Sequence, residues 1–158
     1  RESFGEGMRQ IASALKTLAY EMPQVQFIFP VHANPNVSEV MMKELAGLDN
    51  LLLTRPVDYL SFIALMKDAR VIVTDSGGIQ EEAPSLGVPV VVMRETTERT
   101  EGVEKGFSVL AGTDPQKIYQ SVISLYQEGL QVQGTNPYGD GFSSKRAWDI
   151  LEQIGVIS

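Results

Sequence analysis

The stretch Val71-Ile-Val-Thr-Asp-Ser-Gly-Gly-Ile-Gln-Glu-Glu82 decides the fold, because it passes from a strand pattern through a glycine turn into a helix pattern. Residues 71–74 are apolar or β-branched, which predicts a short buried strand. Two glycines in the turn at 75–78 let the backbone approach a ligand without a Cβ in the way. The free N–H groups of a helix that begins there point at the same place, and the helix dipole favours an anion. The stretch predicts a phosphate-binding turn, with a plain strand-to-helix turn as the alternative.

Glu82 lies four residues beyond the second glycine, within reach of hydroxyls on whatever group carries the phosphate. The first hypothesis is therefore a nucleotide or phosphosugar site. The turn alone does not distinguish the two ligands.

Strand and helix patterns alternate along the rest of the chain. Apolar runs predict further strands at residues 25–31, 50–54, 88–93 and 107–111. Amphipathic spacing predicts helices at residues 3–22 with Ser3 as N-cap, at 37–46 with Asn36 or Ser38 as N-cap, after Asp58, after Gly78, after Thr113 and at 143–153. This order predicts the α/β class: one domain over residues 1–158, a doubly wound, Rossmann-like parallel sheet with helices on both faces.

Polar turns follow four of the predicted strands, at residues 32–36, 55–58, 75–78 and 94–101. Ligands of such sheets bind beyond the carboxyl ends of the strands. We therefore expect all four turns to line one edge, which is better evidence for a site than any single motif. The shared position of the turns does not indicate which reaction the site would catalyse.

The composition excludes several kinds of partner and site. The net charge is −7 and no run of Lys or Arg occurs, so neither nucleic acid nor an anionic membrane surface is an expected partner. There is no cysteine and a single histidine, which argues against a metal site. No apolar run is long enough to span a membrane. The chain begins at Arg1 rather than Met, so we expect a piece of a longer protein.

Five blocks, taken in order, closely resemble the non-hydrolysing UDP-N-acetylglucosamine 2-epimerases of bacteria. The blocks are Arg1-Glu-Ser-Phe-Gly-Glu6, Pro30-Val-His-Ala-Asn-Pro-Asn36, Thr74-Asp-Ser-Gly-Gly-Ile-Gln-Glu-Glu-Ala-Pro-Ser-Leu-Gly87, Met93-Arg-Glu-Thr-Thr-Glu-Arg99 and Asn136-Pro-Tyr-Gly-Asp-Gly141. The resemblance implies one half of the two-domain fold of B-type glycosyltransferases. This chain corresponds to the C-terminal, nucleotide-binding half, and a strand preceding Arg1 would lie near the middle of the sheet.

The resemblance also implies a set of UDP contacts. It places Ser76, Gly77 and Gly78 at the diphosphate, Glu82 at the ribose hydroxyls, Arg99 at phosphate or sugar, and Phe62 with the backbone near Val57 at the uracil. Many members have glutamine where this chain has Val57, so one side-chain contact to the base is lost. Two interpretations of His32 stay open, a structural turn histidine or a contact to a second, regulatory UDP-sugar.

The family's reaction interconverts UDP-N-acetylglucosamine and UDP-N-acetylmannosamine by elimination of UDP and its re-addition. By resemblance, the catalytic carboxylates lie in the N-terminal domain, so no catalytic residue is expected in this chain. No metal or other cofactor is implied. The implied partners are a UDP-sugar, the N-terminal domain and a second copy in a homodimer, and the implied location is the cytoplasm.

Three alternatives remain at this point: a B-type glycosyltransferase domain, a hydrolysing 2-epimerase, and a stand-alone binding module with a merely structural glycine turn. Two further expectations concern single features. Glu81 is expected to be solvated or to face the other domain. Without that domain, part of the last helix, including Trp148, should be an exposed apolar face.

Overall fold

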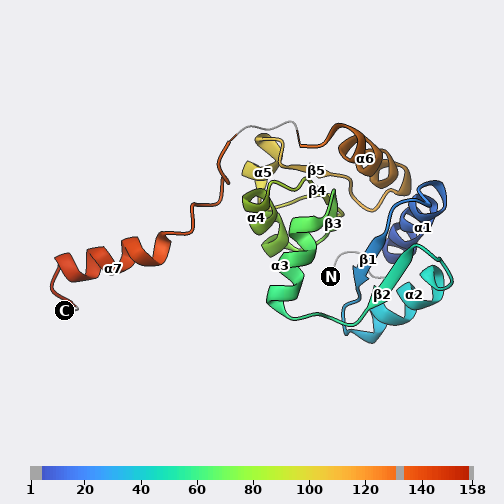
Figure 1. Ribbon diagram of the computed structural model, residues 1–158, viewed down its shortest axis with the longest axis horizontal. Helices are drawn as coiled ribbons and strands as arrows, with labels where there is room; N and C mark the ends of the chain where they lie inside the picture. Colours follow the sequence, from blue (N-terminus) through green and yellow to red (C-terminus); the bar gives the residue numbers. More distant parts are fainter. Residues whose placement is uncertain (1–4, 131–133, 157–158) are drawn as a thin grey trace.

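Strands and helices alternate along the chain in the computed structural model, which describes residues 5–130 and 134–156 (Figure 1). The strands are β1 (Phe27–Pro30), β2 (Leu51–Thr54), β3 (Ile72–Thr74), β4 (Val90–Val92) and β5 (Ser108–Leu110). The helices are α1 (Glu6–Glu21), α2 (Pro35–Leu45), α3 (Tyr59–Asp68), α4 (Gly77–Leu86), α5 (Thr100–Glu104), α6 (Pro115–Glu128) and α7 (Ser143–Gln153). The predicted α/β class and each predicted strand are confirmed.

All strand pairs are parallel, as predicted, but their hydrogen bonds form two sheets. One sheet is β1–β2 and the other is β3–β4–β5. Figure 1 shows β1 as the strand of its sheet that lies nearer to β3. One edge of β1 and one edge of β3 therefore have no strand partner among the described residues. The further strand implied before Arg1 stays a prediction.

The two sheets share a core in spite of this division. Leu51 of β2 and Val91 of β4 belong to one buried apolar cluster, to which α1, α2 and α6 contribute. Val90 and Val92 face a second cluster, formed with α3 and α4. Successive side chains of β4 thus enter opposite layers, as a strand covered on both faces requires. Helices on both faces, the doubly wound arrangement, are confirmed.

Side-chain caps explain where several helices begin. The Asn34 carboxamide oxygen accepts the Asn36 N–H at 3.0 Å and Pro35 takes the first helical position, so the prediction of Asn36 or Ser38 as the cap of α2 was wrong. Asp58 caps α3 as predicted, by accepting the Ser61 N–H at 3.1 Å. The predicted cap of α1, Ser3, lies outside the described residues.

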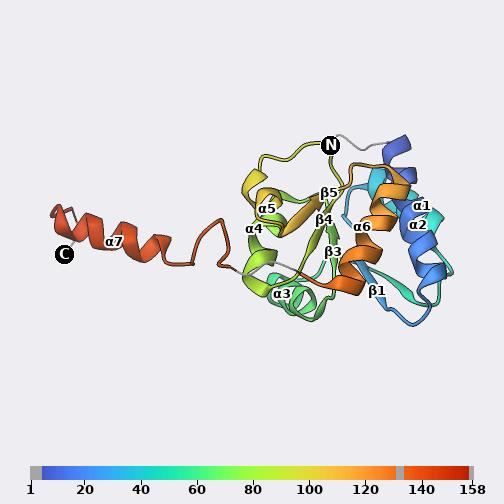
Figure 2. The same ribbon diagram turned by 90° about the horizontal axis from the view of Figure 1, so that it is seen from above.

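Helix α7 projects away from the rest of the molecule (Figures 1 and 2). It has no buried residue, and 55% of Trp148 and 65% of Ile154, the residue after the helix, are exposed. The prediction of an exposed apolar face on the last helix is confirmed. Within the described residues, the helices lack the length and apolar character that a membrane span requires.

Candidate functional site

The four polar turns form two pairs, one at the carboxyl end of each sheet. The turns at 32–36 and 55–58 follow the paired strands β1 and β2. The turns at 75–78 and 94–101 follow the paired strands β3 and β4, and the Arg99 side chain of the second turn lies against Gly77 of the first. The second pair therefore contains the predicted phosphate-binding turn and the candidate cation Arg99.

Helix α4 begins at the glycine turn without a side-chain cap. Ser76 is its N-cap residue, and the Ser76 hydroxyl makes no capping hydrogen bond. The Ser76 N–H donates to the Thr74 hydroxyl at 3.0 Å. By contrast, an Asn or Asp side chain caps each of α2, α3 and α6. The first N–H groups of a helix have no intrahelical acceptor, so those of α4 remain available to an anion.

Arg99 lies directly over this turn. A Cβ built on Gly77 would come within 2.9 Å of the Arg99 Cζ, so the glycine permits the close approach of the guanidinium. The Arg99 Nε donates to Glu81 at 2.8 Å and its Nη1 donates to Glu98 at 2.7 Å. The hydrogen bond that Arg99 donates to Glu81 is the main cause that raises the pKa of Arg99. The Glu81 side chain is 42% exposed, in keeping with the expected solvated position, and it also pairs with Arg99 inside this chain, a partner that the sequence did not predict.

A buried glutamine links the two turns. Gln80 is 2% exposed, and its Nε2 donates to the Ser76 carbonyl at 3.2 Å. Its Oε1 accepts the Thr97 hydroxyl at 2.7 Å, and that hydroxyl accepts the Arg99 N–H at 3.1 Å. One side chain thus satisfies polar groups from both turns and fixes their separation. Sequence reasoning missed Gln80, whose only cue is a polar residue among buried helix positions.

The remaining assigned residues surround the turn less closely. Glu82 is partly buried on α4, and its carboxylate has no hydrogen-bond or ion-pair partner among the described residues. Phe62 of α3 and Ile79, the residue after Gly78, pack against the same buried apolar cluster. Val57 is 37% exposed in the segment between β2 and α3. Their contacts with a nucleotide stay predictions.

His32 is exposed in the turn after β1. Its Nδ1 accepts the Asn34 N–H at 3.1 Å, so the imidazole stabilises the turn that begins α2. This bond favours the structural interpretation of His32. The regulatory interpretation stays a prediction.

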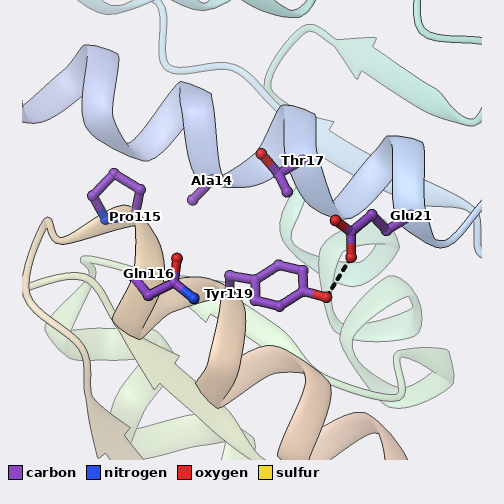
Figure 3. Close-up of a pocket in the computed structure, with 6 residues that line it drawn as sticks. All are labelled: Ala14, Thr17, Glu21, Pro115, Gln116 and Tyr119. Atoms are coloured by element: carbon purple, nitrogen blue, oxygen red, sulfur yellow. Dashed lines mark hydrogen bonds between the residues drawn. The ribbon is translucent and has the colours of Figure 1, made fainter.

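A separate pocket lies between α1 and α6 (Figure 3). Its lining residues are Ala14, Thr17, Glu21, Pro115, Gln116 and Tyr119. The Tyr119 hydroxyl donates to Glu21 across the pocket, and this hydrogen bond raises the pKa of Tyr119. The pocket shares no residue with the glycine turn. The described residues contain no cluster of three His, Asp or Glu side chains that would hold a metal ion.

Comparison with known sequences identifies the family. Residues 1–152 match the sequence profile of the family described as UDP-N-acetylglucosamine 2-epimerase. A UDP-N-acetylglucosamine 2-epimerase of Yersinia pestis is 51% identical over 99% of this chain, and that of Bacillus subtilis is 44% identical over 98%. The chain covers 43% and 41% of these two relatives, so it spans less than half of their length.

Solved structures agree with this assignment. The UDP-GlcNAc 2-epimerase of Neisseria meningitidis bound to UDP-GlcNAc superposes with a TM-score of 0.90 at 41% identity, over 97% of this chain and 42% of that one. The Methanocaldococcus jannaschii enzyme in complex with UDP-GlcNAc and UDP gives a TM-score of 0.81 at 32% identity, over 94% of this chain and 41% of that one. Both the sequence and the fold of this chain match those of these relatives over nearly its whole length. It belongs to the UDP-N-acetylglucosamine 2-epimerase family.

Proposed function

We propose that this chain is the UDP-binding part of an enzyme that interconverts UDP-N-acetylglucosamine and UDP-N-acetylmannosamine. The observation that carries the proposal is the uncapped N-terminus of α4 at a glycine turn, with the Arg99 guanidinium directly over Gly77. Backbone N–H groups and a cation at one point suit a diphosphate. Support also comes from the relatives in Neisseria meningitidis and Methanocaldococcus jannaschii, which were solved with UDP-GlcNAc bound.

The proposed reaction breaks the bond between the sugar and UDP and later re-forms it. Negative charge develops on the departing diphosphate, so fixed donors at that point stabilise the transition state. The N–H groups of α4, the Ser76 hydroxyl and Arg99 supply such donors. Proton transfer at C2 of the sugar requires carboxylates, which we assign to an N-terminal domain of the longer protein. In this proposal the chain binds the leaving group and does not itself transfer protons.

The nucleoside would lie on the side of the turn that carries Glu82. The free carboxylate of Glu82 suits the two ribose hydroxyls, because a carboxylate accepts hydrogen bonds from both. Phe62 and the backbone near Val57 would contact the uracil. Beyond the nucleotide, we propose a cytoplasmic homodimer of the longer protein, and a second UDP-sugar near His32 as a regulator.

Calorimetric titration of the chain with UDP tests the proposal. We expect weak binding by the unchanged chain, with affinity lowered about tenfold or more in Glu82→Ala, because a hydrogen bond to a charged group is lost. Asp68→Ala is the matched control, since it removes the same charge from the far end of α3 and should bind UDP normally.

Two results would count against the proposal. Equal UDP affinity in Glu82→Ala and the unchanged chain would refute the ribose assignment. Epimerisation of UDP-N-acetylglucosamine by the chain alone would refute the assignment of the proton-transferring groups to another domain.

A further inference from the structure

A segment beyond α6 runs past α5 and α4 before the chain continues into α7 (Figure 1). We call residues 136–138 the strap. The Asn136 Nδ2 donates to the Glu81 carbonyl at 2.8 Å and to the Ser85 hydroxyl at 2.6 Å. The Tyr138 hydroxyl donates to the Arg99 carbonyl at 2.8 Å and accepts the Gly102 N–H at 2.8 Å. The strap thus binds α4 at one end and the start of α5 at the other.

The two backbone points that the strap holds belong to the residues of the ion pair at the glycine turn. Asn136 binds the main chain of Glu81, and Tyr138 binds the main chain of Arg99. The side chains of Glu81 and Arg99 meet at 2.8 Å. Within the strap, the Asn136 carboxamide oxygen accepts the Tyr138 N–H at 2.9 Å, which fixes the spacing of its two anchors. The strap therefore sets the distance between the segments that carry Glu81 and Arg99.

The contact of Tyr138 with α5 is tightly packed. Gly102 is buried, and a Cβ built on it would lie 2.6 Å from the Tyr138 hydroxyl oxygen. Burial is the main cause that raises the pKa of Tyr138, so the hydroxyl keeps its proton at neutral pH and remains a donor. A phenylalanine at this position would leave the Gly102 N–H and the Arg99 carbonyl without their present partner.

We propose that Tyr138 is a positioning residue that, with Asn136, holds the Arg99 guanidinium against Gly77 for contact with the diphosphate. This inference rests on the proposed function, because it takes the ligand at the glycine turn to be UDP. Tyr138 itself would not touch the nucleotide. Its influence on binding would pass through Arg99 alone, which separates this role from a general contribution to stability.

Titration of four tyrosine and arginine variants with UDP and with uridine tests the inference. We expect Tyr138→Phe to weaken UDP binding about fivefold and to leave uridine binding unchanged, because only the diphosphate contacts Arg99. In an Arg99→Gln background, the added Tyr138→Phe change should have no further effect on UDP affinity. Tyr119→Phe is the matched control, since it removes a tyrosine hydroxyl bond between α1 and α6, away from the turn (Figure 3).

Amide hydrogen exchange without ligand gives a second measurement. Tyr138→Phe should speed exchange at residues 99–104, whereas Tyr119→Phe should not. If the unchanged chain binds UDP and Tyr138→Phe binds it equally well, the inference is overturned and the proposed function stands. If the unchanged chain does not bind UDP, the proposed function fails, and the role of Tyr138 at a diphosphate fails with it. In that case, faster exchange at residues 99–104 in Tyr138→Phe would still show that the strap fixes the backbone at Arg99. Unchanged exchange in Tyr138→Phe would refute this structural role too.

Discussion

Two adjacent glycines at the turn have different surroundings. A Cβ on Gly77 would meet the Arg99 guanidinium at 2.9 Å, whereas a Cβ on Gly78 would meet only the Ser76 hydroxyl oxygen at 3.9 Å. Neither glycine has a positive φ, so alanine fits the backbone at both positions. Gly77 is thus required by what lies over it, and not by its own conformation.

Gly77→Ala should displace the Arg99 side chain and weaken UDP binding about tenfold, because a charge-assisted contact is lost. The free energy of unfolding should change by less than about 1 kcal/mol, since the end of a flexible side chain can move. The resonance of the Arg99 Nε–H in an NMR spectrum reports its pairing with Glu81 directly. It should shift in Gly77→Ala and stay in place in the matched variant Gly78→Ala. An unshifted resonance in Gly77→Ala would contradict the close contact.

The sequence predicted those residues whose roles depend on near neighbours in the chain. The glycine turn and the Asp58 cap both follow from neighbours in the chain. The roles of Gln80 and Tyr138 were not predictable, because their partners lie 17 and 39 positions away. The ion pair of Glu81 was not predictable for the same reason, since Arg99 is 18 positions distant.

The N-terminal ends of the helices differ in a way that separates stability from binding. Asp58 accepts the Ser61 N–H at the start of α3, while Ser76 makes no such bond at the start of α4. A capped end is satisfied within the chain, whereas an uncapped end, as in α1, α4, α5 and α7, leaves its donors for water or a ligand, and only at α4 does a glycine turn with Arg99 accompany it. The sequence alone did not reveal the difference, because serine and aspartate are both common caps.

Exchanging these two residues for alanine should give opposite results. Asp58→Ala should lower the free energy of unfolding by about 1 kcal/mol, the usual value of an N-cap, and leave diphosphate binding intact. Ser76→Ala should change stability by less than about 0.5 kcal/mol and weaken UDP binding about fivefold. Urea unfolding and UDP titration of both variants make the comparison. If Ser76→Ala lowered the free energy of unfolding by about 1 kcal/mol, as the loss of an N-cap does, the Ser76 hydroxyl would stabilise the helix rather than bind the ligand.

At the scale of the whole molecule, α7 stands apart from a body built around two sheets (Figure 2). Its apolar side chains are exposed, so they contribute no burial to the stability of this chain. We propose that this face packs against another part of the longer protein. That contact would need the longer protein.

Ending the chain before Ser143 should leave the free energy of unfolding within about 0.5 kcal/mol of its original value, because none of the described residues that it removes is buried. The strap stays in the shortened chain, so UDP affinity should also persist. Ile118→Ala in α6 is a useful comparison, since Ile118 is 0% exposed and its truncation should cost about 2–5 kcal/mol. Thermal and urea unfolding of the two variants provide the test. A marked loss of stability on removal of α7 would show that the helix packs on the body in solution.

The alternation of strands and helices, the glycine turn at the start of α4 and the family of the protein were all predictable from the amino-acid sequence. These features depend on local periodicity and on contiguous motifs, which a linear chain displays directly. Only the tertiary structure decided the division into two sheets, the pairing of Arg99 with Glu81 and the strap over both. Such contacts join segments far apart in the chain, and their partners are selected by packing geometry rather than by any spacing in the sequence.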